Sequence, residues 1–111
     1  MPEDCKEEVA EKLKRYKSED IILTNHAIWR SLERDVDMEE LKRDLLDPKE
    51  LYAAQRLKAK GEREEKFKCF FKKSNRTTII AVIVINLRIL VITVTNRKRK
   101  LGRMVRMDAK M

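Results

Sequence analysis

The chain has 111 residues and a formal net charge of +8, and charged residues make up 41% of it. This length suits one domain and leaves no room for a second. Two cysteines and a single histidine do not easily supply a four-ligand zinc site, so we expect neither a metal nor a cofactor. No hydrophobic core of a signal peptide precedes the cysteines, which indicates a cytoplasmic protein with reduced thiols.

The basic excess is concentrated at the C-terminal end. Residues 97–111 contain seven Lys or Arg and one Asp, whereas residues 1–20 are net acidic. Such a patch favours a polyanionic partner, with nucleic acid first and an anionic membrane second. We divide the single domain into an N-terminal helical region at 1–20, a core at 21–96 and a basic tail at 97–111.

The first half of the chain predicts helices. From Glu3 to Tyr16 apolar residues recur at steps of three and four, which is typical of an amphipathic helix lying on a sheet. Residues 21–23 are apolar and fit either a short strand or a connection. A second helix is predicted from about His26 to Arg34, and a third starts at Asp37 with capping-box spacing and ends before Pro48.

The second half predicts strands. Residues 51–58 and 63–73 alternate apolar and polar side chains, as half-exposed antiparallel strands do. Residues 77–85 and 88–95 are β-branched runs on either side of a tight turn, which predicts a hairpin. Apolar and polar residues do not alternate in it, so we expect both of its faces to be covered. A helical layer is expected on one face, and the N-terminal helix or a partner on the other. The fold class is α+β, with two to three helices on a four-stranded, mostly antiparallel twisted sheet.

The hairpin is also long and apolar enough to suggest a membrane helix. Arg88 near its middle and its β-branched composition argue against that, so no membrane association is expected.

His26, Arg30 and Arg34 are the candidate catalytic residues. At four-residue steps they spread over only about 80° of a helix surface and form one basic ridge. Cleaving RNA without a metal needs a base for the 2′-hydroxyl, an acid for the leaving oxygen and cations for the charge on phosphorus. Histidine and arginine supply such groups. In the alternative interpretation, His26 packs locally and the arginines are a solvated face.

The opposite side of the same helix is apolar. Ile28, Leu32 and Val36 lie together there, with Trp29 at the margin. We therefore expect the core contacts of this helix to come from residues outside the ridge, which stays free for solvent or a ligand.

A second cationic surface is predicted on the strands. Lys66, Lys68 and Lys72 share one strand face, with Arg56 expected beside them. Such a row often serves solubility and edge protection; together with the basic tail it would line a groove for a phosphate backbone. Rings able to stack on bases are few, namely Trp29, Tyr52 and Phe70, so we do not expect sequence-specific readout of a single strand. The candidate nucleic-acid-binding residues are Arg56, Lys66, Lys68, Lys72, Arg97, Lys98 and Arg99.

The segment from Thr24 to Arg34, followed by Val36, an acidic helix start and Asp47-Pro48, resembles the pattern H-A-x-x-R-x-x-x-R-G-I-s-x-E-E-V. That pattern belongs to a family of small prokaryotic proteins of unknown function, which is similar in fold to the RelE and BrnT toxins of toxin–antitoxin systems. The resemblance covers residues 21–96. The chain departs from it at Asp35, where the family has Gly, so a left-handed turn there is less comfortable.

The resemblance implies a RelE-like fold, with helices packed on one side of a twisted, largely antiparallel sheet. It also implies a toxin-type protein: a metal-independent endoribonuclease acting on mRNA, free or ribosome-associated, and neutralised by an antitoxin. The resemblance transfers only His26, Arg30 and Arg34 as candidate site residues. The alternative is a non-catalytic nucleic-acid-binding or protein-interaction module of the same fold. Apolar surface left on the hairpin would also suit a homodimer.

Overall fold

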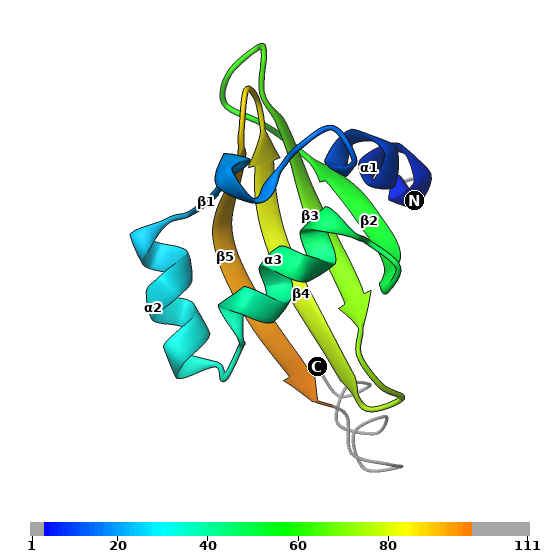
Figure 1. The fold of residues 1–111 in the computed structure, drawn as a ribbon, viewed down its shortest axis with the longest axis vertical. Coiled ribbons are helices and arrows are strands. Elements are labelled where there is room, and N and C mark those ends of the chain that lie inside the picture. Colours follow the sequence, from blue (N-terminus) through cyan, green and yellow to red (C-terminus); the bar gives the residue numbers. More distant parts are fainter. Residues whose placement is uncertain (1–3, 99–111) are drawn as a thin grey trace.

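One five-stranded sheet and three α-helices make up the computed structural model, which describes residues 4–98 (Figure 1). The helices are α1 (Lys6–Leu13), α2 (Asn25–Glu33) and α3 (Met38–Leu46), with a short 3-10 helix at Ser18–Asp20. The strands are β1 (Ile21–Leu23), β2 (Leu51–Leu57), β3 (Glu65–Lys72), β4 (Thr77–Ile85) and β5 (Ile89–Lys98). The predicted α+β class is confirmed. Within the described residues, no helix is long and apolar enough to cross a membrane.

The strand order is β1-β5-β4-β3-β2. Strands β2 to β5 form the predicted antiparallel meander. The sheet has five strands rather than the predicted four, because β1 pairs parallel to β5, with Ile21 opposite Ile89. A three-residue apolar run carries no period of its own, and its partner lies far along the chain, so the sequence alone left this segment undecided.

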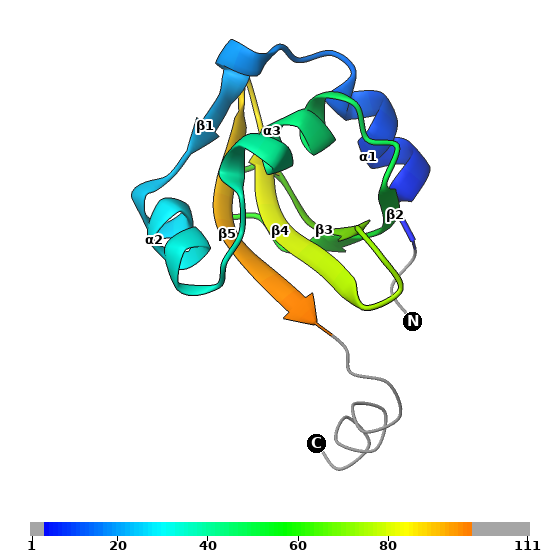
Figure 2. The same ribbon diagram turned by 60° about the horizontal axis from the view of Figure 1, so that its bottom comes forward.

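Helices α1 and α3 lie on the same face of the sheet, which curves around α3 (Figure 2). We call this the covered face. Val9 and Leu13 of α1 are fully buried, and Leu41 and Leu45 of α3 are at most 1% exposed. Fully burying a Leu or Phe side chain stabilises a fold by about 1.5–3 kcal/mol, so this packing holds both helices on the sheet. The residues of β2 to β5 in this core are Leu51, Ala54, Phe67, Cys69, Phe71, Ile79, Ala81, Ile83, Ile85, Ile89, Val91 and Val94.

The opposite face carries no helix among the described residues, and we call it the open face (Figures 1 and 2). The expectation that the N-terminal helix covers it is wrong, because α1 shares the covered face with α3. Ile80 and Val84 are nevertheless only 7% and 8% exposed, because neighbouring side chains on the adjacent strands surround them. The open face comprises Tyr52, Ala53, Gln55, Leu57, Lys66, Lys68, Phe70, Lys72, Thr78, Ile80, Val82, Val84, Leu90, Thr93, Thr95 and Arg97.

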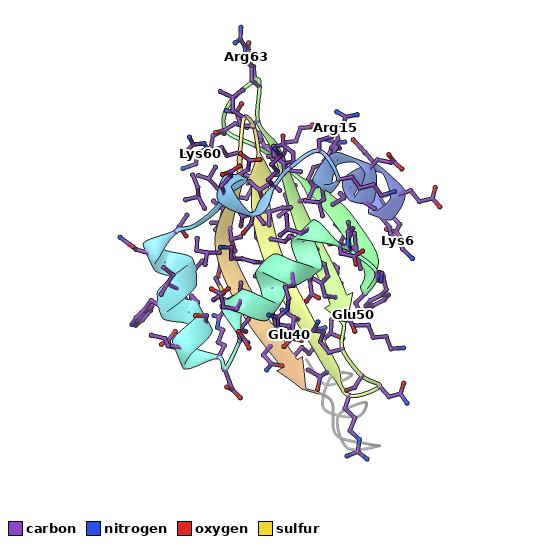
Figure 3. All side chains as sticks on the ribbon, viewed as in Figure 1. Lys6, Arg15, Glu40, Glu50, Lys60 and Arg63 are labelled. Carbon is purple, nitrogen blue, oxygen red and sulfur yellow. The ribbon has the colours of Figure 1, made fainter. Side chains whose placement is uncertain are left out.

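Charged side chains surround the fold. Lys60 and Arg63 extend from the β2–β3 loop, and Lys6 and Arg15 extend from the region of α1 (Figure 3). These cations are spread over different elements.

The turn between α2 and α3 contains Asp35, which has a positive φ of 55°. The Val36 N–H donates to the Ser31 carbonyl at 2.9 Å, as in a Schellman motif, whose left-handed position usually holds glycine. Asn96 Nδ2 donates to the Asp35 carbonyl at 3.0 Å and so holds the turn against β5. The left-handed conformation is therefore kept without glycine, and Asp is one of the residues that tolerate it best.

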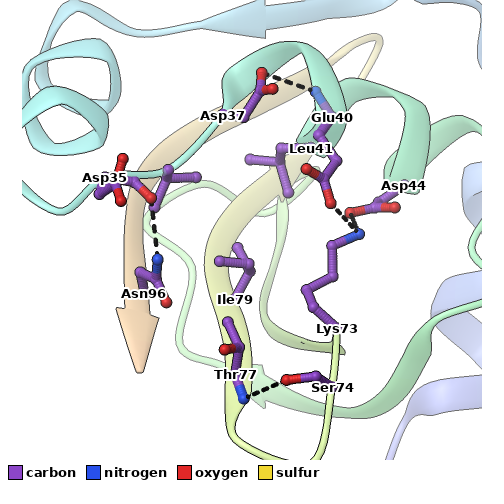
Figure 4. A pocket seen from close by; sticks show the side chains of 11 residues that line it. Asp35, Asp37, Glu40, Leu41, Asp44, Lys73, Ser74, Thr77, Ile79 and Asn96 are labelled. Carbon is purple, nitrogen blue, oxygen red and sulfur yellow. Dashed lines mark hydrogen bonds and ion pairs between the residues drawn. The ribbon is translucent and has the colours of Figure 1, made fainter. Parts of the chain in front are cut away.

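Lys73, directly after β3, ties α3 to the sheet (Figure 4). Its Nζ lies 2.6 Å from Asp44 Oδ2 and 2.8 Å from Glu40 Oε1, and it also pairs with Glu50. Burial raises the pKa of Asp44, and the hydrogen bond and charge of Lys73 offset this only in part. Burial lowers the pKa of Lys73, but its hydrogen bonds to the three carboxylates raise it above its usual value.

Replacing Lys73 by Met should destabilise the fold at neutral pH by about 2 kcal/mol, because Asp44 would keep a buried charge without a cation. The loss should shrink as the pH falls towards 3.8, the ordinary pKa of Asp. Without Lys73 the pKa of Asp44 in the folded protein rises further. The folded state then binds a proton on the Asp44 carboxylate more tightly than the unfolded chain does, so protonation favours folding. Urea unfolding of both proteins across this pH range measures the difference.

The double variant Lys73→Met/Asp44→Leu is the control for this experiment. It should regain most of the lost stability, because a buried ion pair replaced by apolar residues leaves no uncompensated charge. A loss in Lys73→Met that stays constant with pH would show that Asp44 is not its cause.

Candidate functional site

Helix α2 runs beside β5, beyond the point where β1 ends (Figure 1). At its start, Thr24 Oγ1 donates to the Val91 carbonyl at 2.8 Å. After its end, Arg34 Nη1 donates to the Val94 carbonyl at 2.9 Å and to Thr95 Oγ1 at 2.7 Å. These side chains satisfy edge carbonyls of β5, so α2 closes an edge to which another chain could otherwise add a strand.

Small residues form the buried side of α2. Ala27 and Ser31 are 0% and 4% exposed, whereas Ile28 and Leu32 are 41% and 78% exposed. Core contacts do come from outside the ridge, as predicted, but of the apolar set only Val36, which follows the helix, is buried in the core. The reason is that α2 packs against a strand edge, where a close approach of backbones requires small side chains.

The predicted catalytic residues lie along one side of α2 but have different partners. Arg34 is held by β5, which gives it a structural role. Arg30 Nη1 lies 2.8 Å from Glu33 Oε1, and its guanidinium lies 5.1 Å from the centre of the Trp29 ring. His26 is exposed, with its Nε2 3.5 Å from Arg30 Nε. His26 therefore remains for contact with a ligand, whereas Arg30 would share its charge between Glu33 and a phosphate.

The predicted lysines and Arg97 lie together on the open face. Cross-strand pairing puts Lys72 and Arg97 on either side of Thr78. Adjacent strands are about 4.8 Å apart, so the Cα atoms of Lys72 and Arg97 are about 10 Å apart. Within residues 4–98, Lys66, Lys68, Lys72 and Arg97 form no ion pair. The cations that do pair with acidic residues are Lys12, Lys14, Arg30, Lys49, Arg56 and Lys73.

Arg56 lies on the covered face instead of beside the lysines, which corrects the prediction. It stands opposite Phe67, with its guanidinium 4.8 Å from the ring centre. It pairs with Glu65 at 2.9 Å and with Glu8 of α1, and these hydrogen bonds raise its pKa. The register of β2 shifts around Tyr52, and one extra residue moves every later side chain to the other face.

A groove of about 170 Å³ opens at one end of the open face. Among residues 4–98, its lining includes the cations Lys72, Arg76 and Arg97 and the rings of Tyr52 and Phe70, and no acidic residue. The two ring centres are 6.3 Å apart, in an edge-to-face contact. The groove thus combines positive charge with aromatic surface.

Sequence reasoning missed Arg76 as a binding residue. The signal was its position in the short β3–β4 turn, which brings it back beside Lys72 and Arg97 at the same end of the sheet. Of the other predicted contacts, Arg99 lies outside the described residues, as does the side chain of Lys98.

The ridge on α2 borders the open face. Ile80 and Thr95 stand opposite each other on β4 and β5, and Arg34 donates to the Thr95 hydroxyl. Arg30 and His26 precede Arg34 by about one and two helical turns on the same side of α2. Arg34, at one end of the ridge, therefore lies at the border of the open face.

A second cavity, of about 290 Å³, lies between α3, the β3–β4 turn and β5 (Figure 4). Its lining within the described residues includes the acidic residues Asp35, Asp37, Glu40 and Asp44 and a single cation, Lys73, which is already paired with Glu40 and Asp44. In the part of the chain that the structure describes, no three His, Cys, Asp or Glu residues are grouped as metal ligands. Burial raises the pKa of Cys69 to about 12, so this thiol is a poor nucleophile at neutral pH.

Comparisons with known proteins give no match to this chain, whether with protein-family models, curated proteins or solved structures. The choice of a candidate site therefore depends on the chain's own geometry. That geometry favours the open face, where cations without an acidic partner in residues 4–98 lie beside two aromatic rings.

Proposed function

We propose that this protein binds RNA on the open face of its sheet. The observation that carries the proposal is that the two faces differ in whether their cations have acidic partners. On the covered face, Arg56 is neutralised by Glu8 and Glu65. On the open face, Lys68 and Lys72 have no acidic partner among residues 4–98, so their charge is available to a polyanion.

Single-stranded RNA fits this face better than a membrane surface or a duplex does. Membrane insertion needs exposed apolar side chains beside the cations, but Ile80 and Val84 at the centre of the face are nearly buried. A sheet that displays rings among cations is suited to unpaired bases, which stack on the rings while the phosphates meet the positive charge. Tyr52 and Phe70 supply these rings.

The resemblance to toxin-type proteins supports the same partner. The layout of helices on one side of a twisted, mostly antiparallel sheet agrees with what that resemblance implies. It also suggests cleavage of the bound RNA as a second candidate function, and the position of the ridge favours it. His26 would take the proton of a 2′-hydroxyl as its oxygen attacks phosphorus, while Arg30 would stabilise the charge that develops on the phosphate. The bond to the 5′-oxygen breaks, and this leaving oxygen would take its proton from water. Arg34 would act by positioning α2 rather than by touching RNA.

The remaining partners that the sequence suggests, an antitoxin and a second copy of the chain, stay predictions. The open face offers them little apolar surface, because Ile80 and Val84 are nearly buried. Larger apolar side chains are exposed on α2, where Trp29 is 55% and Leu32 78% exposed.

The double variant Lys68→Gln/Lys72→Gln should bind single-stranded RNA more weakly and with a smaller salt dependence. Each lost phosphate contact lowers the slope of log K against log salt by about 0.7 for a single strand. The matched control is Lys14→Gln/Lys49→Gln, which removes the same charge from exposed sites off the open face. Fluorescence anisotropy with a labelled RNA at several salt concentrations gives both quantities. If the two variants lose RNA affinity equally, binding depends only on the net charge of the protein, which would contradict a site on the open face.

For the second candidate function, the wild-type protein should cleave mRNA in the presence of EDTA. His26→Ala should slow cleavage by about 10²–10⁴-fold, the usual contribution of a general base or acid. Arg30→Ala should also slow it, while RNA affinity changes little in His26→Ala. Asn25→Ala, another exposed position of α2, is the control. Equal cleavage rates in all four proteins would remove the ridge from the mechanism.

A further inference from the structure

We infer that the groove of Tyr52, Phe70, Lys72, Arg76 and Arg97 is a subsite for one unpaired nucleotide, with its base on the Tyr52 ring and its phosphate between the cations. The inference rests on the proposed function, because it assigns one step of RNA binding to one place on the open face. It applies the preference for unpaired bases to a single nucleotide held in this groove.

The base would lie on Tyr52. This side chain is 50% exposed, so part of its ring surface is open to solvent. Its edge-to-face contact with Phe70, at an interplanar angle of 63°, holds the ring in place before any ligand arrives. A ring that is already fixed loses little conformational entropy on stacking, which makes it an effective platform for a base.

The phosphate would lie among the three cations. Lys72 and Arg97 reach the groove from β3 and β5, and Arg76 reaches it from the β3–β4 turn. The hydroxyl of Ser74 accepts hydrogen bonds from the Arg76 and Thr77 N–H groups, which fixes the backbone of that turn. Two guanidinium groups can each bind a phosphate through paired hydrogen bonds, so the charge is also directional.

The size of the groove indicates part of a longer ligand. Sites for whole small molecules usually measure about 300–1,000 Å³, whereas this groove measures about 170 Å³. It is open towards the rest of the face through Ile80, which also lines it. A duplex would keep its bases stacked inside the helix and could offer only phosphates to the cations, so the ring makes the subsite selective for single strands.

The test compares Tyr52→Leu with the wild-type protein on two probes: a short labelled RNA of mixed sequence, and the same RNA annealed to its complement. The variant should bind the single strand about 10-fold more weakly, within the range measured for loss of one stacked base. Its affinity for the duplex should be unchanged. Arg76→Gln should weaken binding of both probes, because it removes a phosphate contact, and Lys49→Gln should weaken neither.

The results separate the subsite from the proposed function. Wild-type protein that binds neither probe contradicts both. If the wild-type protein binds the single strand and the Tyr52→Leu variant binds it with equal affinity, the subsite is overturned. That result leaves RNA binding on the open face intact. A Tyr52→Leu variant that loses affinity for both probes equally also overturns the subsite, because stacking on an unpaired base cannot weaken duplex binding. Circular dichroism of each variant controls for folding.

Discussion

The packing of α1 and α3 on a single face of the sheet is the interaction on which the rest of the structure depends. Both helices bury their apolar stripes against Phe67, Phe71 and the alternate residues of β4 and β5. Nothing comparable remains in residues 4–98 to cover the other face (Figure 2). Burial of one face therefore leaves the second as a broad exposed surface, and the side chains on that surface decide what the protein can bind.

The same packing determines which cations have acidic partners. Where α1 and α3 meet the strands, Arg56, Lys12 and Lys73 all have carboxylate partners. The bulge at Tyr52 contributes to this sorting, because it moves Arg56 to the covered face and leaves a ring on the open one. What remains on the open face is positive charge without acidic neighbours in the described chain, together with two rings.

Much of the fold could be predicted from the sequence, because its signals are local. The Asp37 cap, the alternation around Cys69 and the turn at Asn86 each define an element without reference to distant residues. The errors arise where distant segments meet. Three features produce no periodic pattern in the sequence from which they could be predicted. They are the pairing of β1 with β5, the β2 bulge that moves Arg56, and the packing of α2 against a strand edge. For the candidate site, the lysine row was predictable by period two, whereas Arg76 joins it only through the geometry of a turn.

The central claim is that RNA contacts one face of the sheet and not the other. Adjacent residues of β4 report on the two faces separately, since Ile80 and Val82 belong to the open face and Ile79 and Ile83 to the covered one. Methyl NMR spectra of Ile- and Val-labelled protein, recorded during titration with single-stranded RNA, test this directly. RNA bound on the open face should shift the Ile80 and Val82 methyl signals and leave those of Ile79 and Ile83 in place. Shifts confined to Ile79 and Ile83, or no shifts at saturating RNA, would contradict it.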